Sequence, residues 1–200
     1  MSASLAHLID DDDAIRDALA WLLRSRGIAS RGWPSADAFL ADYDNAMRGC
    51  LIIDVRMPGM GGPELFERLL ERGSRMPAIF LTGHGDVPLA VHAIKKGAFD
   101  FIEKPCNDNE LVDRVVAAIR LDEEQRLRHA TADHRASRLE GLSSREREVM
   151  ELILAGKYNK VIADELGIAM RTVEVHRARI FEKMGVKSAV ELAQLLSGSR

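Results

Sequence analysis

Residues 50–62 read CLIIDVRMPGMGG, an apolar run that ends in an acid, Asp54, and continues into a turn rich in glycine. A short continuous apolar run of this kind is typical of a strand buried on both faces of a parallel sheet. A helical pattern over 63–72 follows, with Pro63 at a position suited to the first turn of a helix. This stretch therefore predicts a strand, a loop and a helix in succession, which is the repeating unit of an α/β fold.

The same alternation continues on both sides of this stretch. Short apolar strands are predicted at 5–9, near 28–31, at 50–55, at 78–82 and at 98–102, and helices at 14–26, at 63–72, at 88–96 and from 107 onward. Near-continuous apolar strands separated by amphipathic helices are typical of a parallel sheet with helices on both faces. The first half of the chain is therefore predicted to be an open α/β sheet.

The region after Cys106 is predicted to be one long helix. Asn107 and Glu110 have the spacing of a helix start, and neither Gly nor Pro occurs between Cys106 and Glu140. Acids stand four residues before bases at 122 and 126 and at 124 and 128, which supports a helix that continues past residue 121. We expect this helix to loosen at 131–133, where helix propensity falls. A disordered tether is the alternative.

The last third of the chain has the pattern of a small all-α domain. Ser143 with Glu146, and Ser188 with Glu191, have the spacing of capping boxes. They predict helices from 143 to near 156, at 159–166, at 170–184 and from 188, with glycines at their ends. The predicted organisation is a first domain at 1–121, a helical linker at 122–138 and a second domain at 139–200.

Composition excludes several classes of protein. The chain has 200 residues, of which 46% are hydrophobic and 30% charged, and this is typical of globular domains rather than disordered chains. No apolar run reaches the roughly 18 residues of a membrane span, and the N-terminus lacks the pattern of a signal peptide. Cys50 and Cys106 lack metal-ligand spacing and fit reduced thiols. We therefore expect a cytoplasmic protein that does not contact a membrane.

Reactive side chains follow the predicted strands at one end. Asp10 and Asp11 follow the first strand, Asp54 ends the third, Thr82 ends the fourth and Lys104 follows the fifth. The carboxyl ends of parallel strands form the ligand crevice of an open α/β sheet, so these side chains are expected to converge. Two unit charges about 4 Å apart repel by about 4 kcal/mol at an effective dielectric of about 20. Three acids at this place therefore favour a bound divalent cation, and their oxygen ligands favour Mg²⁺.

Each of these residues alone has an ordinary explanation. The run of acids at 10–13 would more often be a solvated turn and a helix cap, and Lys104 before Pro105 is an ordinary turn. Their occurrence together at four strand ends is what indicates a site. An ionised carboxylate beside a cation and a lysine is a competent phosphoryl acceptor, and it needs no general base.

Four sequence blocks resemble those of a known family. LIDDDDAIR (8–16), LIIDVRMPGMGG (51–62), LTGHGD (81–86) and FDFIEKP (99–105) resemble the signature blocks of response-regulator receiver domains, in particular the FixJ-like branch of the NarL/FixJ family. The resemblance implies a (βα)5 flavodoxin-like fold with the parallel sheet order 2-1-3-4-5. Asp13, an acid beside the usual pair, and Cys106, where many relatives carry a bulky apolar residue, are mild departures.

The resemblance also implies roles for the residues at the strand ends. Asp54 would be the phosphoacceptor for a sensor histidine kinase, with Lys104 contacting the phosphoryl oxygens. Mg²⁺ would be held by Asp11, Asp54 and the backbone carbonyl of Arg56, with Asp10 in support.

A switch pair and a kinase-facing surface follow from the same resemblance. Thr82 and Phe101 correspond to the pair in which the hydroxyl turns toward the aspartyl phosphate and the aromatic ring turns inward. Specificity for the kinase falls on the first helix and nearby loops, around Ala14, Asp17 and Ala18.

Residues 142–196 resemble the LuxR-type helix-turn-helix domain over its full length. Its small core is predicted to contain Ile162, Ala163, Leu166, Val173 and Val175. Between 170 and 187 five bases stand against two acids, which suits a contact with nucleic acid, although such helices are common on other surfaces. The helix predicted at 170–184 has a size that fits the major groove of double-stranded DNA.

Positions that match the family assign the DNA contacts. Glu174, Val175 and Ala178 would face bases, and the same helix exposes Arg171. The residues that would mostly hold phosphates are Thr172, His176, Arg177, Arg179 and Lys183, with help from Asn159 and Lys160. For His176 a partly packed surface histidine is an equally good interpretation, and Glu174 would also repel the DNA backbone. Ala169 stands where relatives carry Ser or Thr as a helix cap, a loss that typically costs about 1 kcal/mol.

These observations predict a phosphorylation-activated transcription regulator rather than an enzyme. In the family, the unphosphorylated receiver inhibits the DNA-binding domain, and phosphorylation promotes a homodimer. The dimer would form through the face near Val91, Lys95 and Asp100 or through the last helix, 188–196, and would bind two half-sites of promoter DNA beside RNA polymerase. A phosphatase that forms an aspartyl phosphate is disfavoured, because Arg56 stands where such enzymes carry a second acid. A regulator that uses its first domain only to dimerise remains an alternative.

Overall fold

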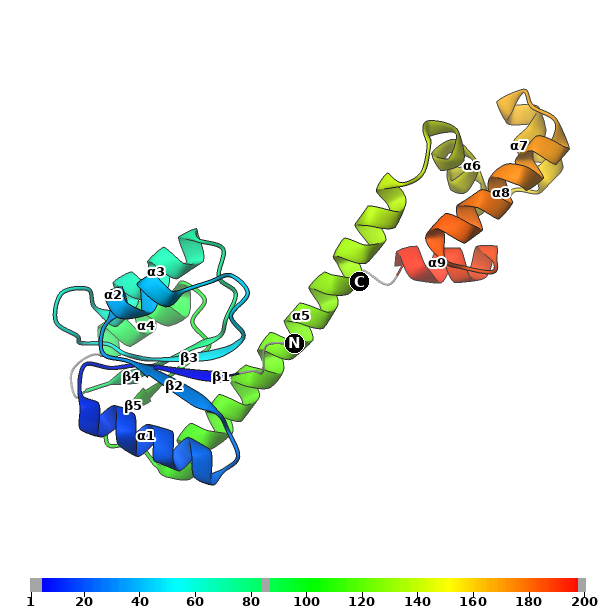
Figure 1. Ribbon diagram of the computed structural model, residues 1–200. Helices are drawn as coiled ribbons and strands as arrows, with labels where there is room; N and C mark the ends of the chain where they lie inside the picture. The colour runs from blue at the N-terminus through cyan, green and yellow to red at the C-terminus, as the bar shows by residue number, and fades with distance from the viewer. Residues whose placement is uncertain (1–4, 84–86, 198–200) are drawn as a thin grey trace. The chain divides into compact units, whose positions relative to one another are not determined.

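The structure is a computed structural model that describes residues 5–83 and 87–197. The chain divides into two compact units, Met1–Arg126 and Leu127–Arg200. The first contains a sheet with its covering helices, and the second contains helices only. Figure 1 shows the sheet of the first unit and the helices of the second.

The first unit is built on five parallel strands. They are β1 (Leu5–Ile9), β2 (Ser30–Trp33), β3 (Gly49–Asp54), β4 (Ala78–Thr82) and β5 (Asp100–Glu103). They lie in the order β2-β1-β3-β4-β5, so the predicted flavodoxin-like topology is confirmed. Every residue of β3, the central strand, is buried, as the continuous apolar run predicted.

Helices cover both faces of this sheet. The helices are α1 (Asp13–Ser25), α2 (Ala36–Asp42), α3 (Gly62–Glu71), α4 (Val87–Lys95) and α5 (Asp108–Glu140). Figure 1 shows α1 and the first turns of α5 on one face and α2, α3 and α4 on the other. Side chains of β3 alternate between the two cores, with Leu51 and Ile53 on the α2–α3–α4 side and Cys50 and Ile52 on the α1–α5 side.

Polar side chains begin several of these helices. Asp12 accepts hydrogen bonds from the amides of Ala14 and Ile15 and caps α1. Ser35 caps α2, a seven-residue helix that no pattern in the sequence predicted. Asn107 accepts bonds from the amides of Asn109 and Glu110, so the predicted start of α5 is correct.

The second unit packs four short helices around one core. They are α6 (Ser144–Leu154), α7 (Asn159–Leu166), α8 (Met170–Met184) and α9 (Ala189–Ser197). The capping box of Ser143 and Glu146 is present at the start of α6. Gly167 and Gly185 end α7 and α8 in the left-handed conformation, which a glycine adopts without a steric penalty.

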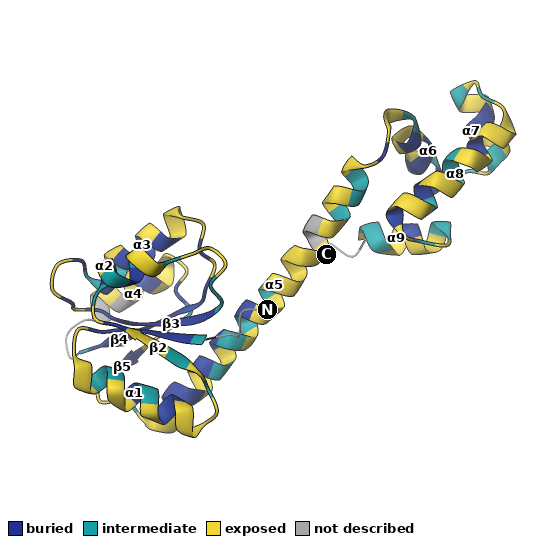
Figure 2. Ribbon diagram, viewed as in Figure 1, coloured by how far each residue is buried: buried dark blue, intermediate teal, exposed yellow. Residues whose placement is uncertain are grey.

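Helix α5 is continuous over 33 residues, from Asp108 to Glu140. It therefore keeps helical structure at 131–133, and the prediction that it loosens there is wrong. Buried and exposed residues alternate along its first turns (Figure 2), where Leu111, Val115 and Ala118 are buried, whereas Leu127, further along, is 64% exposed. Despite this length, none of the described helices is both long enough and apolar enough to cross a membrane.

The base of β3 is tied to α5 by a buried polar contact. The Gly49 amide donates to a carboxylate oxygen of Asp122 at 3.0 Å, across 73 residues of sequence. Spacing suggested Asp122 as a partner for Arg126 on the surface of the helix. The structure instead buries Asp122, where it satisfies a main-chain donor that water cannot reach.

Candidate functional site

Three of the five predicted strand-end residues, Asp10, Asp54 and Lys104, converge at one edge of the sheet. The Lys104 ammonium lies between two carboxylates, with Nζ 2.9 Å from Asp10 Oδ2 and 2.5 Å from Asp54 Oδ1. Asp10 follows β1, Asp54 ends β3 and Lys104 follows β5, so three separate strands bring these groups together. Asp10 is 3% exposed and Asp54 is 9% exposed. The three side chains therefore form a compact cluster of two acids and one base.

Main-chain amides hold the remaining carboxylate oxygens. Asp54 Oδ2 accepts from the Arg56 amide at 2.7 Å, and Asp10 Oδ1 accepts from the Asp12 amide at 2.9 Å. Burial raises the pKa of the Asp54 carboxyl, and the hydrogen bond and charge of Lys104 oppose that rise. Burial would lower the pKa of Lys104, but its hydrogen bonds to Asp54 and Asp10 outweigh this and raise the pKa.

Thr82 and Phe101 lie on the adjacent strands β4 and β5. Thr82 ends β4, is 2% exposed, and accepts a hydrogen bond at its carbonyl from the Lys104 amide at 2.7 Å. Phe101 is 37% exposed, so its ring is at the surface in this structure. Of the sequence block 81–86, residues 84–86 lie outside the described residues.

Asp11 is separate from this cluster. Its side chain is exposed, and the described residues contain no group of three or more His, Cys, Asp or Glu side chains arranged to hold a metal. The donor chemistry nevertheless fits Mg²⁺, which binds through one or two carboxylates and keeps several waters. Two buried acids against one lysine also leave a net negative charge at this edge. The ligand set Asp10, Asp11, Asp54 and the Arg56 carbonyl remains a prediction.

Two supporting residues were missed by the sequence analysis. Arg16, on the first turn of α1, donates from Nη1 to the Asp10 carbonyl at 2.6 Å and also pairs with Asp13. Gly62, which begins α3, has no room for a side chain, because a Cβ there would lie 2.3 Å from the Asp54 carbonyl oxygen. The glycine pair after the strand was a visible signal for Gly62, but the contact of Arg16 depends on the folded loop.

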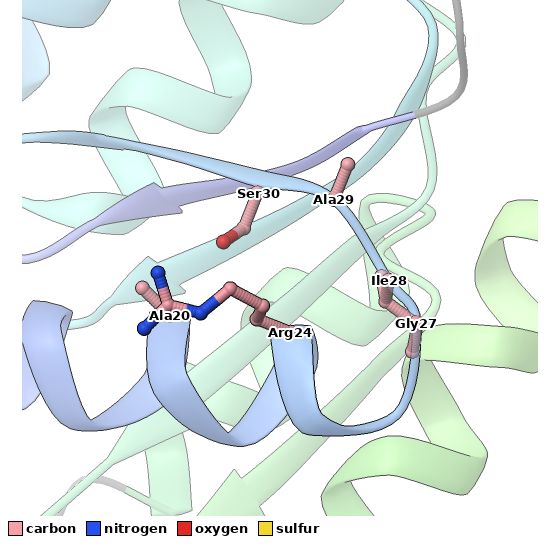
Figure 3. Close-up of a pocket in the computed structure, with 6 residues that line it drawn as sticks. All are labelled: Ala20, Arg24, Gly27, Ile28, Ala29 and Ser30. Atoms are coloured by element: carbon pink, nitrogen blue, oxygen red, sulfur yellow. The ribbon is translucent and has the colours of Figure 1, made fainter.

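A pocket at the other edge of the sheet is not part of this site. It lies between the end of α1 and the start of β2, and it is lined by Ala20, Arg24, Gly27, Ile28, Ala29 and Ser30 (Figure 3). Ser30 begins β2, whereas the acidic cluster lies at the carboxyl ends of the strands. The two features are therefore at opposite edges.

The predicted DNA-contact residues lie on α7 and α8. The exposed ones are Lys160, Arg171, Thr172, Glu174, Val175, Ala178, Arg179 and Lys183, and the partly buried ones are Asn159, His176 and Arg177. Most of the predicted contact residues of α8 are therefore available to a ligand. Val175 is 44% exposed, so its assignment to the core is wrong, whereas Ile162, Ala163 and Val173 are buried as predicted.

Two α8 residues have packing roles besides their predicted contacts. The Arg177 guanidinium lies over the ring of Phe181, 5.3 Å from its centroid. His176 is partly buried, and its Nδ1 is enclosed without a hydrogen-bond partner among the described atoms. This supports the alternative interpretation of His176 as a partly packed surface residue.

Lys183 is held inside the second unit rather than left free. Its Nζ donates to Glu146 Oε2 at 2.7 Å and to the Gly141 carbonyl at 3.0 Å. The same Glu146 oxygen accepts from the Ser143 amide at 2.8 Å, so α8 is joined to the capping box of α6. The hydrogen bonds from Lys183 and from the Ser143 amide lower the pKa of Glu146 from 4.5 to about 2.

Glu146→Gln is expected to destabilise the second unit at neutral pH, because it removes the charge that pairs with Lys183. The expected loss is only about 1 to 2 kcal/mol, because Lys183 is partly exposed and water screens the pair. The ionised form is favoured by folding, so its contribution is complete above pH 4.5 and is lost as the pH falls toward 2. Urea unfolding followed by circular dichroism should therefore show a difference in the free energy of unfolding between the wild type and Glu146→Gln at pH 7, and a smaller difference at pH about 3. A difference independent of pH would contradict this assignment.

Ala169→Ser is expected to stabilise α8 by about 1 kcal/mol. Ala169 is the N-cap of α8 and makes no side-chain hydrogen bond to the first turn. A serine hydroxyl can accept from the orphan amides there, and we expect both the melting temperature and the affinity for DNA to rise. Ala169→Val lacks the acceptor and serves as the control. An unchanged melting temperature together with unchanged DNA affinity in Ala169→Ser would show that this end does not fray.

Comparisons with known proteins agree with both parts of the chain. The profile "Response regulator receiver domain" matches residues 6–116, and the profile "Bacterial regulatory proteins, luxR family" matches residues 140–196. The C4-dicarboxylate transport transcriptional regulatory protein DctR of Rhodobacter capsulatus is 52% identical over 94% of this chain and 97% of its own length. The transcriptional regulatory protein FixJ of Azorhizobium caulinodans is 48% identical over 94% of this chain and 90% of its own length.

Solved structures give the same result. The response regulator StyR matches with a TM-score of 0.93 and 38% identity, over 98% of this chain and all of that one. Full-length FixJ from B. japonicum is 45% identical over 98% of this chain and 96% of its own, with a TM-score of 0.62. These relatives are regulators rather than enzymes, and receiver domains generally bind Mg²⁺ at their phosphorylation site. The chain therefore belongs to the NarL/FixJ family of response regulators and is a phosphorylation-regulated, DNA-binding transcription regulator with a receiver domain and a LuxR-type helix-turn-helix domain.

Proposed function

We propose that Asp54 accepts a phosphoryl group from a sensor histidine kinase, and that this modification relieves inhibition by the receiver and promotes dimerisation and promoter binding. The observation that carries the proposal is the position of the Lys104 ammonium, which contacts both Asp10 and Asp54 at the carboxyl ends of the strands. A buried acid that ends a central strand, beside a lysine that reaches it, has the geometry of an acceptor rather than of a surface ion pair.

The transfer needs little from the protein beyond position and charge. A carboxylate oxygen of Asp54 attacks phosphorus, the bond from phosphorus to the donor breaks, and an acyl phosphate remains on Asp54. Lys104, 2.5 Å from Asp54 Oδ1, is close enough to contact an incoming phosphoryl oxygen. The amide of Arg56, 2.7 Å from Oδ2, fixes the orientation of the carboxylate. When bound by Asp10, Asp11, Asp54 and the Arg56 carbonyl, Mg²⁺ supplies the remaining positive charge.

The signal is proposed to leave the site through Thr82 and Phe101. Thr82 is buried beside Lys104, to which its carbonyl is already hydrogen-bonded. Phe101 is exposed on the neighbouring strand, so an inward turn of its ring would change the surface formed by α4 and β5. That surface contains the exposed Val91 and Lys95, and it is the proposed dimer face, with α9 as the second candidate.

Promoter DNA is the proposed ligand of α7 and α8. Glu174, Val175 and Ala178 are exposed and are proposed to face bases, and the basic residues around them to hold phosphates. We keep the proposed division into a receiver at 1–121, a linker at 122–138 and a DNA-binding domain at 139–200. Cytoplasmic location and contact with RNA polymerase are proposed because they follow from transcription regulation.

The proposal is tested by locating the modification. Full-length protein is incubated with acetyl phosphate and MgCl₂, and its mass is measured before and after proteolysis. One phosphoryl group on the peptide that contains Asp54, absent when the Mg²⁺ is chelated, is the expected result. Phosphorylation confined to any other peptide would reject Asp54 as the acceptor.

A further inference from the structure

The C-terminal end of α8 is closed by a residue of α5. The Arg138 guanidinium donates from Nη1 to the carbonyl of Met184, the last residue of α8, at 2.7 Å. The amides of Gly185 and Val186 bond to other carbonyls of the last turn, at Glu182 and Phe181. Arg138 therefore supplies a partner that the capping motif does not, and its positive charge meets the negative end of the helix dipole.

The reverse contact is also present. Lys183, on α8, donates to the carbonyl of Gly141, the residue that follows the end of α5 at Glu140. The end of each helix thus offers a carbonyl to a cation that comes from the other helix. Two charge-assisted hydrogen bonds in opposite directions fix the last turns of α5 and α8 against each other more firmly than either would alone.

Close packing surrounds this pair of contacts. Leu142, just after α5, is 4% exposed, and it belongs to one core cluster with Ile180 and Met184 of α8. Leu139, on the last turn of α5, packs against the same cluster. A Cβ on Gly185 would lie 2.9 Å from Arg138 Nη1, so the glycine also leaves room for the guanidinium.

We propose that Arg138 is a positioning residue of the DNA-binding domain, which sets the orientation of α8 from the linker helix. The proposal rests on the proposed function of α8 in reading DNA. Arg138 lies before residue 140, where the match to the helix-turn-helix family begins, so this determinant of binding is outside the recognised domain.

A small change at the Arg138 contact would move the end of α8 that is proposed to face bases. Helix α8 has 15 residues and is therefore about 22 Å long. A tilt of about 5° at its C-terminal end moves its other end by about 2 Å, which is enough to break hydrogen bonds to base edges. Loss of Arg138 is therefore expected to weaken binding without removing any contact to DNA.

The test uses the full chain and a DNA site that the phosphorylated wild-type protein selects from a random-sequence pool. Arg138→Met removes the donor, Arg138→Lys keeps a charge and a donor, and Arg126→Met removes an exposed arginine from the same helix as a control. Kd is measured at a temperature at which circular dichroism shows every variant folded. We expect Arg138→Met to bind about fivefold more weakly, Arg138→Lys to recover most of the affinity, and Arg126→Met to match the wild type.

Three results would overturn the proposal, and they have different meanings. Wild-type affinity in folded Arg138→Met would show that the contact serves stability alone. A salt dependence of log Kd that is shallower by about 0.9 in Arg138→Met would show that Arg138 holds a phosphate itself. A further variant, Arg171→Met, tests the premise that α8 binds DNA separately from the proposal that Arg138 orients it. Arg171 is exposed on α8. If that variant also binds normally, α8 is not the reading helix, and the proposed function fails with it.

Discussion

Asp54→Asn is expected to abolish phosphoryl uptake from acetyl phosphate while the receiver stays folded. The amide keeps the shape of the carboxylate but is not a nucleophile toward phosphorus. Burial already disfavours the charged form of Asp54, so a neutral group there should cost little stability. Lys104 keeps its bond to Asp10, at 2.9 Å, and is not left as an unpaired charge. The expected change in the free energy of unfolding is therefore within about 1 kcal/mol.

Mass spectrometry of the intact protein measures this directly. Asp113→Asn is a matched control, because Asp113 is an exposed acid on α5 and is not one of the acids that contact Lys104. The control should take up one phosphoryl group as the wild type does. Uptake in Asp54→Asn at the wild-type rate would contradict the assignment of the acceptor.

Gly49→Ala is expected to unfold the receiver, with a loss of more than about 4 kcal/mol. Gly49 begins β3 with φ of 116°, a conformation that residues with a Cβ rarely adopt. A Cβ at this position would lie 1.9 Å from the carbonyl oxygen of Leu5, on the neighbouring strand β1. The obstacle is main chain rather than a flexible side chain, so β1 and β3 would have to separate. Their separation would also break the bond from the Gly49 amide to Asp122.

Gly73→Ala is the control that separates the steric overlap at residue 49 from the strain of a positive φ. Gly73 has φ of 82°, and nothing lies within 4 Å of the place its Cβ would take, so its cost is that of the conformation alone, about 1 to 2 kcal/mol. Both tryptophans, Trp21 and Trp33, are in the receiver, so their fluorescence in a urea titration reports this domain. Equal losses in the two variants would show that β1 and β3 can make room for a side chain at 49.

Local patterns were enough to predict the framework of the fold. The apolar run before Asp54 and the shorter runs of the other strands have the signature of a buried parallel sheet, and strand order followed from the family resemblance. Helices α7 and α8 begin and end at the predicted residues, and a glycine in the left-handed conformation marks the C-terminal end of each. Helix α2 was missed because seven residues hold too little periodicity to stand out.

The candidate site was predictable only where residues stand at strand ends. Asp10, Asp54 and Lys104 converge because the sheet brings its carboxyl ends together, which needs no knowledge of side-chain packing. The roles of Asp122 and Arg138, in contrast, could not be predicted from the sequence. Each binds a main-chain group more than 40 residues away in sequence, and such contacts leave no local pattern. Val175 was placed in the core beside Val173, although residues two apart on a helix face different directions.

The central claim, that phosphorylation of Asp54 controls DNA binding, is tested most directly by one affinity measurement. The Kd of the full chain for its selected DNA site is determined with and without acetyl phosphate, at fixed salt, in the wild type and in Asp54→Asn. We predict that acetyl phosphate tightens binding by the wild type about tenfold or more and leaves Asp54→Asn at the unphosphorylated value. Equal affinity of the phosphorylated and unphosphorylated wild type, or the same gain in Asp54→Asn, would contradict the claim.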